Sequence, residues 1–192
     1  ANHYTTVAEY DRKFPQNPDD IMPTRFGNIL KATQWYSADR YGMDPGIFWS
    51  RLIYVIPPTY KEMLDDEIDT VMFFVNMSIL FSFLGTISIV FSFFNSGDFV
   101  FRYLTVGVFS FLCAIVFYNS SLKSLHTYGE LVRSSYDLFR LELLQQLKLK
   151  QPNNSWKEYE TWKNLGELIL LGRLSLEFEK LEYQVNFKNS KK

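Results

Sequence analysis

The side chains best suited to acid–base chemistry are few and far apart in this sequence. The two histidines, His3 and His126, are separated by most of the chain, and no phosphate-binding loop, GxGxxG, HExxH or GxSxG motif is present. A catalytic acid and base must both reach one substrate by hydrogen bonds, and no such pair follows from the sequence. We therefore expect a protein that is not an enzyme and that needs no cofactor.

One acidic run, residues 65–69, has the residue types of a cation site. Its carboxylates belong to Asp65, Asp66, Glu67 and Asp69, and hard cations bind clustered carboxylates. Consecutive residues of a helix point in different directions, however, so four carboxylates at this spacing converge only around an irregular turn. Negative charge also suits the beginning of a helix. We expect a solvated helix start here and no metal.

Three arginines lie among aromatic residues in the first third of the chain: Arg25, Arg40 and Arg51. A guanidinium group binds carboxylates and phosphates through paired hydrogen bonds. These arginines are therefore candidates for binding an anionic ligand or a lipid headgroup. The alternative, which we favour, is that they pair with Asp39, Asp44 or the acidic run and brace the fold.

Two apolar segments near the middle predict a transmembrane hairpin. Residues 70–94 carry no charge, and their length of about 37 Å as a helix exceeds the ~30 Å of hydrocarbon in a bilayer. A turn-rich break follows, and then residues 99–118 carry a single charge, Arg102, which can reach the headgroups. The break is too short for a domain, so the two spans must be antiparallel neighbours. Strands fit poorly because alternation with period two is absent.

Basic residues on the flanks of the spans predict the orientation. The connecting loop offers only Arg102, with Asp98 beside it, whereas the other side carries Arg51, Lys61, Lys123, Arg133 and Arg140. The positive-inside rule then places both visible termini in the cytoplasm. The formal net charge of −1 gives no reason to expect a nucleic-acid partner.

Polar and small residues inside the first span predict helix packing. Asn76 is the polar residue deepest in that span, and Gly85 and Ser88 lie on a face of small residues. An unsatisfied amide in hydrocarbon is costly, so we expect Asn76 to face another helix. A pore would need several copies of the hairpin, and the many phenylalanines argue against a wide lumen. We favour packing over conduction.

Helix signals on both sides of the hairpin predict a cytosolic module. Thr24 is a candidate N-cap, Asp44 with Pro45 begins a second short helix that ends before Pro57–Pro58, and Ser155 with Glu158 forms a capping box. The two short helices fit either an interfacial position or a small cytosolic core. Residues 181–187 alternate strictly and predict a strand or an extended arm.

The fold class we expect is mostly α: an integral membrane hairpin with a helical cytosolic module, and either one short strand or an extended arm near the C-terminus. The expected organisation is an N-terminal arm (1–22), short aromatic- and arginine-rich helices (23–69), the transmembrane hairpin (70–94 and 99–118), amphipathic helices and the terminal strand (119–187), and a disordered tail (188–192).

An apolar stripe along the helix after the second span predicts a docking surface. Its residues recur at spacings of three, four and seven and lie on one helix face. They need cover from the C-terminal segment or from a second subunit. The main docking residues we expect are Leu125, Val132, Tyr136, Phe139 and Leu143.

The predicted function follows from that stripe and the hairpin. We expect a membrane protein that works by self-association or as the anchoring subunit of a larger assembly. The alternative is an oligomeric effector or channel gated through its cytosolic part by a small anionic ligand.

A motif in the N-terminal third resembles one found in a group of uncharacterised bacterial multi-pass membrane proteins. It reads TRFGNILKA from Thr24, RYGMD from Arg40 and WSRL from Trp49, followed by a proline pair. The group's pattern is approximately T-R-x-G-N-x-L-x-A, then R-Y-G-x-D, then W-x-R-L. The resemblance implies a bacterial inner-membrane location and a membrane segment upstream of the motif. No activity is implied by it.

Overall fold

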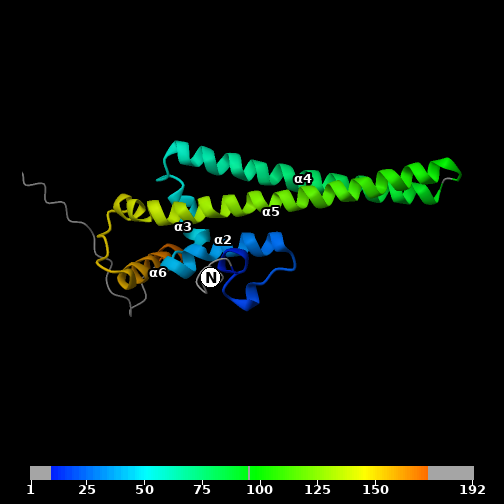
Figure 1. Cartoon of the computed structure of the whole chain (residues 1–192). Coiled ribbons are helices and arrows are strands. Elements are labelled where there is room, and N and C mark those ends of the chain that lie inside the picture. The colour runs from blue at the N-terminus through cyan, green and yellow to red at the C-terminus, as the bar shows by residue number, and fades with distance from the viewer. Residues whose placement is uncertain (1–9, 95, 173–192) are drawn as a thin grey trace, which may run out of the picture.

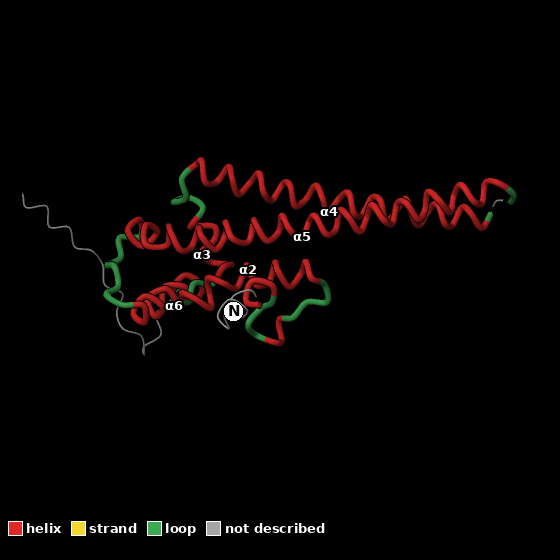
Figure 2. Tube along the Cα trace, in the orientation of Figure 1, coloured by secondary structure: helices red, strands yellow, loops and turns green. Residues whose placement is uncertain are grey.

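The computed structural model of the chain describes residues 10–94 and 96–172, which form a long helical hairpin beside a small helical module (Figure 1). The described elements are the 3-10 helix η1 (Pro18–Asp20) and the α-helices α2 (Arg25–Tyr41), α3 (Pro45–Leu52), α4 (Pro58–Phe93), α5 (Asp98–Gln146) and α6 (Ser155–Leu171). Figure 2 shows no strand in this part of the chain, so the prediction of a mostly helical protein is confirmed. The strand predicted at residues 181–187 lies outside the described residues.

The starts of α2 and α3 are fixed by the predicted caps. The Thr24 hydroxyl oxygen accepts a hydrogen bond from the Gly27 N–H at 3.0 Å. The Asp44 carboxylate accepts from the Gly46 N–H at 2.8 Å, one of the N–H groups that the first turn of a helix leaves unpaired. Gly42 ends α2 in the left-handed region at φ 72°, as glycine permits without strain.

Three helix boundaries differ from the sequence prediction. Helix α3 ends at Leu52, and the proline pair begins α4 with Pro58 at its first position, because proline lacks only an N–H that this position leaves unpaired. The N-cap of α6 is Asn154, which accepts from the Lys157 N–H at 2.8 Å, since asparagine caps as well as serine. The sequence also predicts that the helix after the second span ends near Gln151–Pro152, whereas α5 ends at Gln146.

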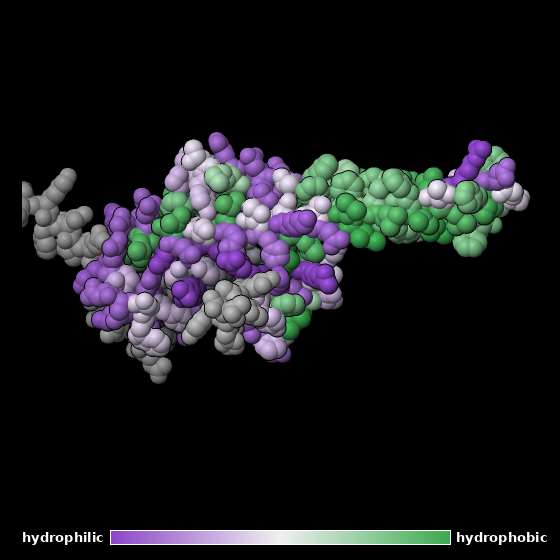
Figure 3. All heavy atoms as spheres, in the orientation of Figure 1, coloured by the Kyte–Doolittle hydropathy of each residue, from purple (hydrophilic) through white to green (hydrophobic). Residues whose placement is uncertain are grey.

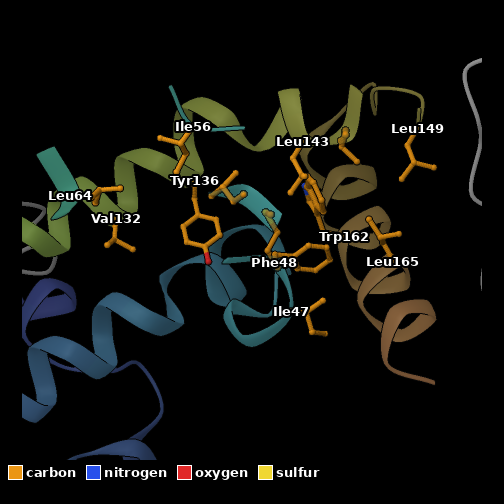
Figure 4. Packing of buried hydrophobic residues seen from close by; sticks show 13 residues of the cluster. Ile47, Phe48, Ile56, Leu64, Val132, Tyr136, Leu143, Leu149, Trp162 and Leu165 are labelled. Atoms are coloured by element: carbon orange, nitrogen blue, oxygen red, sulfur yellow. The ribbon is translucent and has the colours of Figure 1, made fainter. Parts of the chain in front are cut away.

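The module has its hydrophobic core where α3, α5 and α6 meet (Figure 4). Phe48 of α3 and Trp162 of α6 are both fully buried, and their rings meet edge to face with centroids 5.1 Å apart. Tyr136 and Leu144 of α5 complete this centre. Aromatic pairs of this geometry add about 0.5–1.5 kcal/mol beyond the burial of their area. The second half of α5 is therefore a core element of the module.

A smaller cluster joins the module to the base of the hairpin. Its buried residues are Ile29 of α2, Val71 of α4 and Leu125 of α5, with Phe26 and Val75 packed against them. The first turns of α2 therefore lie at the level where the charge-free part of α4 begins. Beyond this level the hairpin projects alone (Figure 1).

Candidate functional site

The projecting hairpin has its apolar side chains outside. Phe83, Phe101 and Phe109 are 65%, 76% and 64% exposed, whereas Ser88 and Ser110 are only 6% and 2% exposed. Figure 3 shows a continuous apolar surface over this part of the molecule. Helices α4 and α5 are each long and apolar enough to cross a membrane. An apolar surface of this extent marks contact with lipid or with another protein.

Small residues hold the two hairpin helices close together. A Cβ atom added at Gly85 would lie 3.2 Å from the carbonyl oxygen of Gly107, so the two backbones approach closely there. The Ser78 hydroxyl donates to the Ala114 carbonyl oxygen across the hairpin at 3.0 Å. The structure thus places Gly85 and Ser88 between α4 and α5.

Asn76 does not face another helix of this chain. Its side chain is exposed, and no hydrogen bond joins it to any residue that the structure describes. Other exposed polar side chains of the hairpin are satisfied within their own helix: Thr86 donates to the Ser82 carbonyl at 2.9 Å and Thr105 to the Phe101 carbonyl at 2.8 Å. Whatever satisfies the Asn76 amide must come from outside the described chain.

The predicted docking stripe lies in the core of the chain itself. Leu125, Val132, Tyr136 and Leu143 are 0%, 6%, 1% and 3% exposed, and Phe139 packs against the same core. Helices α2, α3 and α6 cover the stripe. Of the two expected covers, the C-terminal segment contributes through Trp162 and Leu165 of α6, and α2 and α3 add a cover that the sequence did not predict. The sequence does not show that helices on the N-terminal side of the hairpin fold back onto α5.

A cluster of polar side chains ties α2, α5 and α6 together. The Asp137 carboxylate of α5 accepts from the Tyr36 hydroxyl at 2.9 Å and from the Tyr41 hydroxyl at 2.5 Å, both on α2. The Arg140 guanidinium lies 4.1 Å from the centre of the Tyr41 ring, and its Nε donates to Glu158 of α6 at 2.7 Å. Charge-assisted contacts of this kind are stronger than neutral hydrogen bonds.

The cluster centred on Asp137 joins helices, and its two tyrosines do not transfer protons at neutral pH. Burial raises the pKa of Tyr36 above its ordinary value, and the hydrogen bond to Asp137 raises it further. The same two causes raise the pKa of Tyr41. Both phenols therefore remain protonated donors at neutral pH. Sequence analysis missed this cluster; the only signal was the spacing of Asp137 and Arg140 on one helix face.

A second polar group lies on α5 one turn closer to the hairpin. Arg133 is only 8% exposed, and its Nη1 donates to Glu130 at 2.9 Å; Glu130 also pairs with Arg12 at 3.2 Å. Burial and the nearby positive charges of Lys13, Arg133 and Arg12 lower the pKa of His126. His126 is therefore held in its neutral form.

The three candidate arginines do not meet around one ligand. Arg25 and Arg40 lie at opposite ends of α2, about 22 Å apart along its axis. Both are exposed, and the structure shows neither of them in an ion pair. The Nη1 of Arg51 donates to the Ile47 carbonyl of its own helix. A joint anion site would need these side chains on one surface, which this arrangement does not supply.

A cavity of about 490 Å³ lies between α2, α3 and α5. Its walls include Trp35, Trp49, Tyr128 and Tyr136, so the lining is mainly aromatic. Its volume is within the range of small-molecule sites. Thr33 also lies at this cavity; its buried hydroxyl has no hydrogen-bond partner among the described residues.

The acidic run does not assemble a cation site. Asp65, Asp66 and Asp69 are exposed on α4. Within residues 10–94 and 96–172, no three His, Cys, Asp or Glu side chains are close enough to hold a metal ion.

No family model matches the chain, and neither the curated proteins nor the solved structures contain a significant match.

Proposed function

We propose that this protein is a membrane anchor: its hairpin crosses a lipid bilayer and holds the helical module against one face of the membrane. The observation that carries this proposal is the inverted polarity of the hairpin: most of its exposed side chains are large and apolar, whereas Ser88, Ser110 and Gly107 are buried between its helices. Burying exposed apolar surface gains roughly 25 cal/mol per Å². A hairpin covered with phenylalanine therefore gains much from a bilayer and loses much in water.

The length of the hairpin fits this position. The module's packing reaches Val75, and residues 77–94 beyond it extend for about 27 Å, close to the ~30 Å of hydrocarbon in a bilayer. Asn76 then lies at the edge of the hydrocarbon, where headgroups and water can satisfy its amide. This position explains how Asn76 can be exposed without a second helix beside it.

The module works by self-association or as a subunit of a larger assembly. Among the large apolar side chains exposed on its surface are Leu138 at 61% and Trp156 at 69%. They lie on α5 and α6, which the Arg140–Glu158 ion pair joins. Exposed tryptophan is typical of residues that contribute strongly to protein interfaces. This surface, rather than the buried stripe of α5, is where a second copy or a partner would dock.

Membrane crossing can be tested by labelling from one side. In a Cys113→Ala background, Ser96→Cys in the loop between α4 and α5 and Tyr54→Cys before α4 serve as single reactive sites. An impermeant maleimide applied to intact cells should label only one of the two, and Ser96 is the expected one because basic residues flank the other side. Labelling of both sites, or of neither, in intact cells with both reactive after lysis would contradict a single crossing by each helix.

The assembly can be tested by native mass spectrometry on protein extracted with its surrounding lipid. A homo-oligomer would support self-association, and a foreign protein at fixed stoichiometry would support the subunit role. Trp156→Ser should reduce the assembly, whereas Tyr54→Ser, at a 90% exposed position between α3 and α4, should not. A strictly monomeric chain would rule out both forms.

The aromatic cavity supports a second candidate, an effector whose module senses a small molecule. A ligand between α2, α3 and α5 would alter how the module sits on the hairpin. The lining suits a flat and largely apolar molecule better than the anion expected from the arginines. A flat conductance trace in planar bilayers, with and without a ligand shown to bind, would remove a channel function.

A further inference from the structure

The loop before α2 carries apolar side chains that nothing in the described chain covers. Ile21 is 51% exposed and Met22 is 44% exposed, and Pro23 beside them is exposed as well. We call residues 17–24 the rim loop. Apolar side chains that stay exposed to water do not stabilise the fold. Their exposure here indicates a surface that contacts lipid or protein.

The rim loop is held in one conformation by buried polar contacts. The Asn28 side chain, only 7% exposed, accepts from the Met22 N–H at 2.7 Å and donates to the Met22 carbonyl oxygen at 3.0 Å. A Cβ atom added at Gly27 would lie 2.9 Å from the Met22 Cβ, so glycine lets the loop pack directly on α2. The Lys31–Asp20 ion pair at 3.2 Å ties η1 to the same helix. The exposure of Ile21 and Met22 is therefore built into the fold.

The hairpin fixes where this loop lies relative to a bilayer. Phe26, in the first turn of α2, packs on the cluster that contains Val71 and Val75, at the start of the charge-free part of α4. Figure 1 shows the segment before α2 at the end of the module nearest the projecting hairpin. If the hairpin crosses a membrane, the rim loop must therefore lie at the headgroup layer.

Arg25 adds the charge that such a position favours. It is exposed directly after the rim loop and makes no ion pair within the described chain. A guanidinium at the end of a loop with two apolar side chains matches the layered chemistry of an interface, with phosphate outside and hydrocarbon inside. Two other charged residues lie near the level of the rim loop: Asp69 on α4 and Lys123 on α5.

We infer that the rim loop is a second membrane contact: Ile21 and Met22 insert among the lipid headgroups and Arg25 binds a lipid phosphate. The inference rests on the proposed membrane anchor and adds that the module is docked on the bilayer and not merely tethered to it. A docked module has a fixed orientation to the membrane, which limits the partners that its exposed surfaces can meet.

Spin labels on the full chain in lipid vesicles test this inference. Single cysteines replace Ile21, Tyr54 and Val108 in the Cys113→Ala background, and each label is exposed to oxygen, which concentrates in lipid, and to a water-soluble nickel chelate. Val108, 56% exposed in the middle of the hairpin, should favour oxygen, and Tyr54, 90% exposed, should favour nickel. The label at position 21 should lie between them, well shifted from Tyr54 towards lipid.

The three positions separate the two possible failures. A label at position 21 that matches Tyr54, while Val108 remains lipid-like, would overturn the docking and leave the anchor intact. A Val108 label that favours nickel would overturn both, because the hairpin would then lie outside the bilayer.

The role of Arg25 has its own matched pair. In vesicles that contain phosphatidylglycerol, Arg25→Gln should shift the position-21 label towards water, whereas Arg40→Gln, at the other end of α2, should leave it unchanged. Equal shifts for both variants would show a general charge effect and would overturn the specific phosphate contact.

Discussion

The hairpin and the module bury opposite kinds of side chain. The module hides Phe48, Leu52 and Trp162 completely, whereas the hairpin hides Ser110 and exposes Phe101. Both regions have an interior, but only the module's interior is more apolar than its surface. A single polar solvent cannot favour both arrangements. The difference supports the proposal that the hairpin lies in lipid and the module in water.

Helix α5 makes this comparison within one continuous element. Its first half turns Gly107, Ser110 and Ala114 inward, towards α4. Its second half turns Leu125 and Leu143 inward, into the module. The backbone is helical in both halves of α5, so the side chains alone produce this difference in packing. In apolar surroundings, close backbone approach replaces the burial of large side chains as the source of packing energy.

The largest expected effect comes from a comparison of two substitutions, one phenylalanine to alanine in each region. Phe48→Ala should lower the free energy of unfolding of the module by about 3–5 kcal/mol, because it removes a fully buried ring and leaves a cavity beside Trp162. Phe109→Ala should leave it almost unchanged, since that ring is 64% exposed on the hairpin. Denaturant titration in nanodiscs, followed by tryptophan fluorescence, measures both. Equal losses would mean that Phe109 also belongs to a packed interior.

A smaller effect is expected from two glycines inside helices of the module. A Cβ atom at Gly129 would lie 2.6 Å from the Thr33 hydroxyl oxygen, whereas one at Gly166 would have its nearest neighbour at 3.5 Å. Gly129→Ala should therefore destabilise the α2–α5 packing by about 1–3 kcal/mol despite the better helix propensity of alanine. Gly166→Ala should stabilise the protein by roughly 0.5–1 kcal/mol, since it gains propensity without a clash.

The double variant Gly129→Ala with Thr33→Ala identifies the cause. Without the Thr33 side chain beyond Cβ, the closest remaining atom lies 3.7 Å away, an ordinary van der Waals distance. In thermal unfolding, the double variant should recover most of the loss. Thr33→Ala alone should cost little, because the buried Thr33 hydroxyl has no hydrogen-bond partner in the described part of the chain. Destabilisation by both glycine variants alike would instead point to a general intolerance of change in the module.

The sequence predicts features that depend on neighbouring residues better than those that depend on distant ones. The Thr24 and Asp44 caps and the continuity of α5 beyond its apolar half are present as predicted. Each is set by residues within a few positions. The boundary errors at Pro58 and Asn154 arose where two good candidates for one cap or stop lie side by side.

The fate of the α5 stripe could not be predicted in the same way. Periodicity shows that Val132 and Tyr136 share a helix face, but it does not identify the cover. The cover comes from α2 and α3, more than seventy residues earlier in the chain, and the Asp137 cluster depends on the same long-range packing.

The smallest expected effect is a pH dependence confined to the module. The pKa of His126 lies below its ordinary value of about 6.5, because burial and the charges of Lys13, Arg133 and Arg12 disfavour the imidazolium. The unfolded chain then binds more protons than the folded one between the two pKa values, so stability is fully present above the unfolded pKa and falls as pH drops below it. Asp39 has a raised pKa, which gives the opposite sign: stability falls as pH rises above the ordinary range of that carboxyl. The difference in stability between the native protein and His126→Gln isolates the histidine, and it should shrink from pH 7 to pH 5. Parallel pH profiles for the two proteins would show that His126 is not held neutral by the fold. Residues 70–118 contain no histidine, so the stability of the hairpin should stay constant over this pH range. A change in hairpin stability would contradict the separation of the two regions.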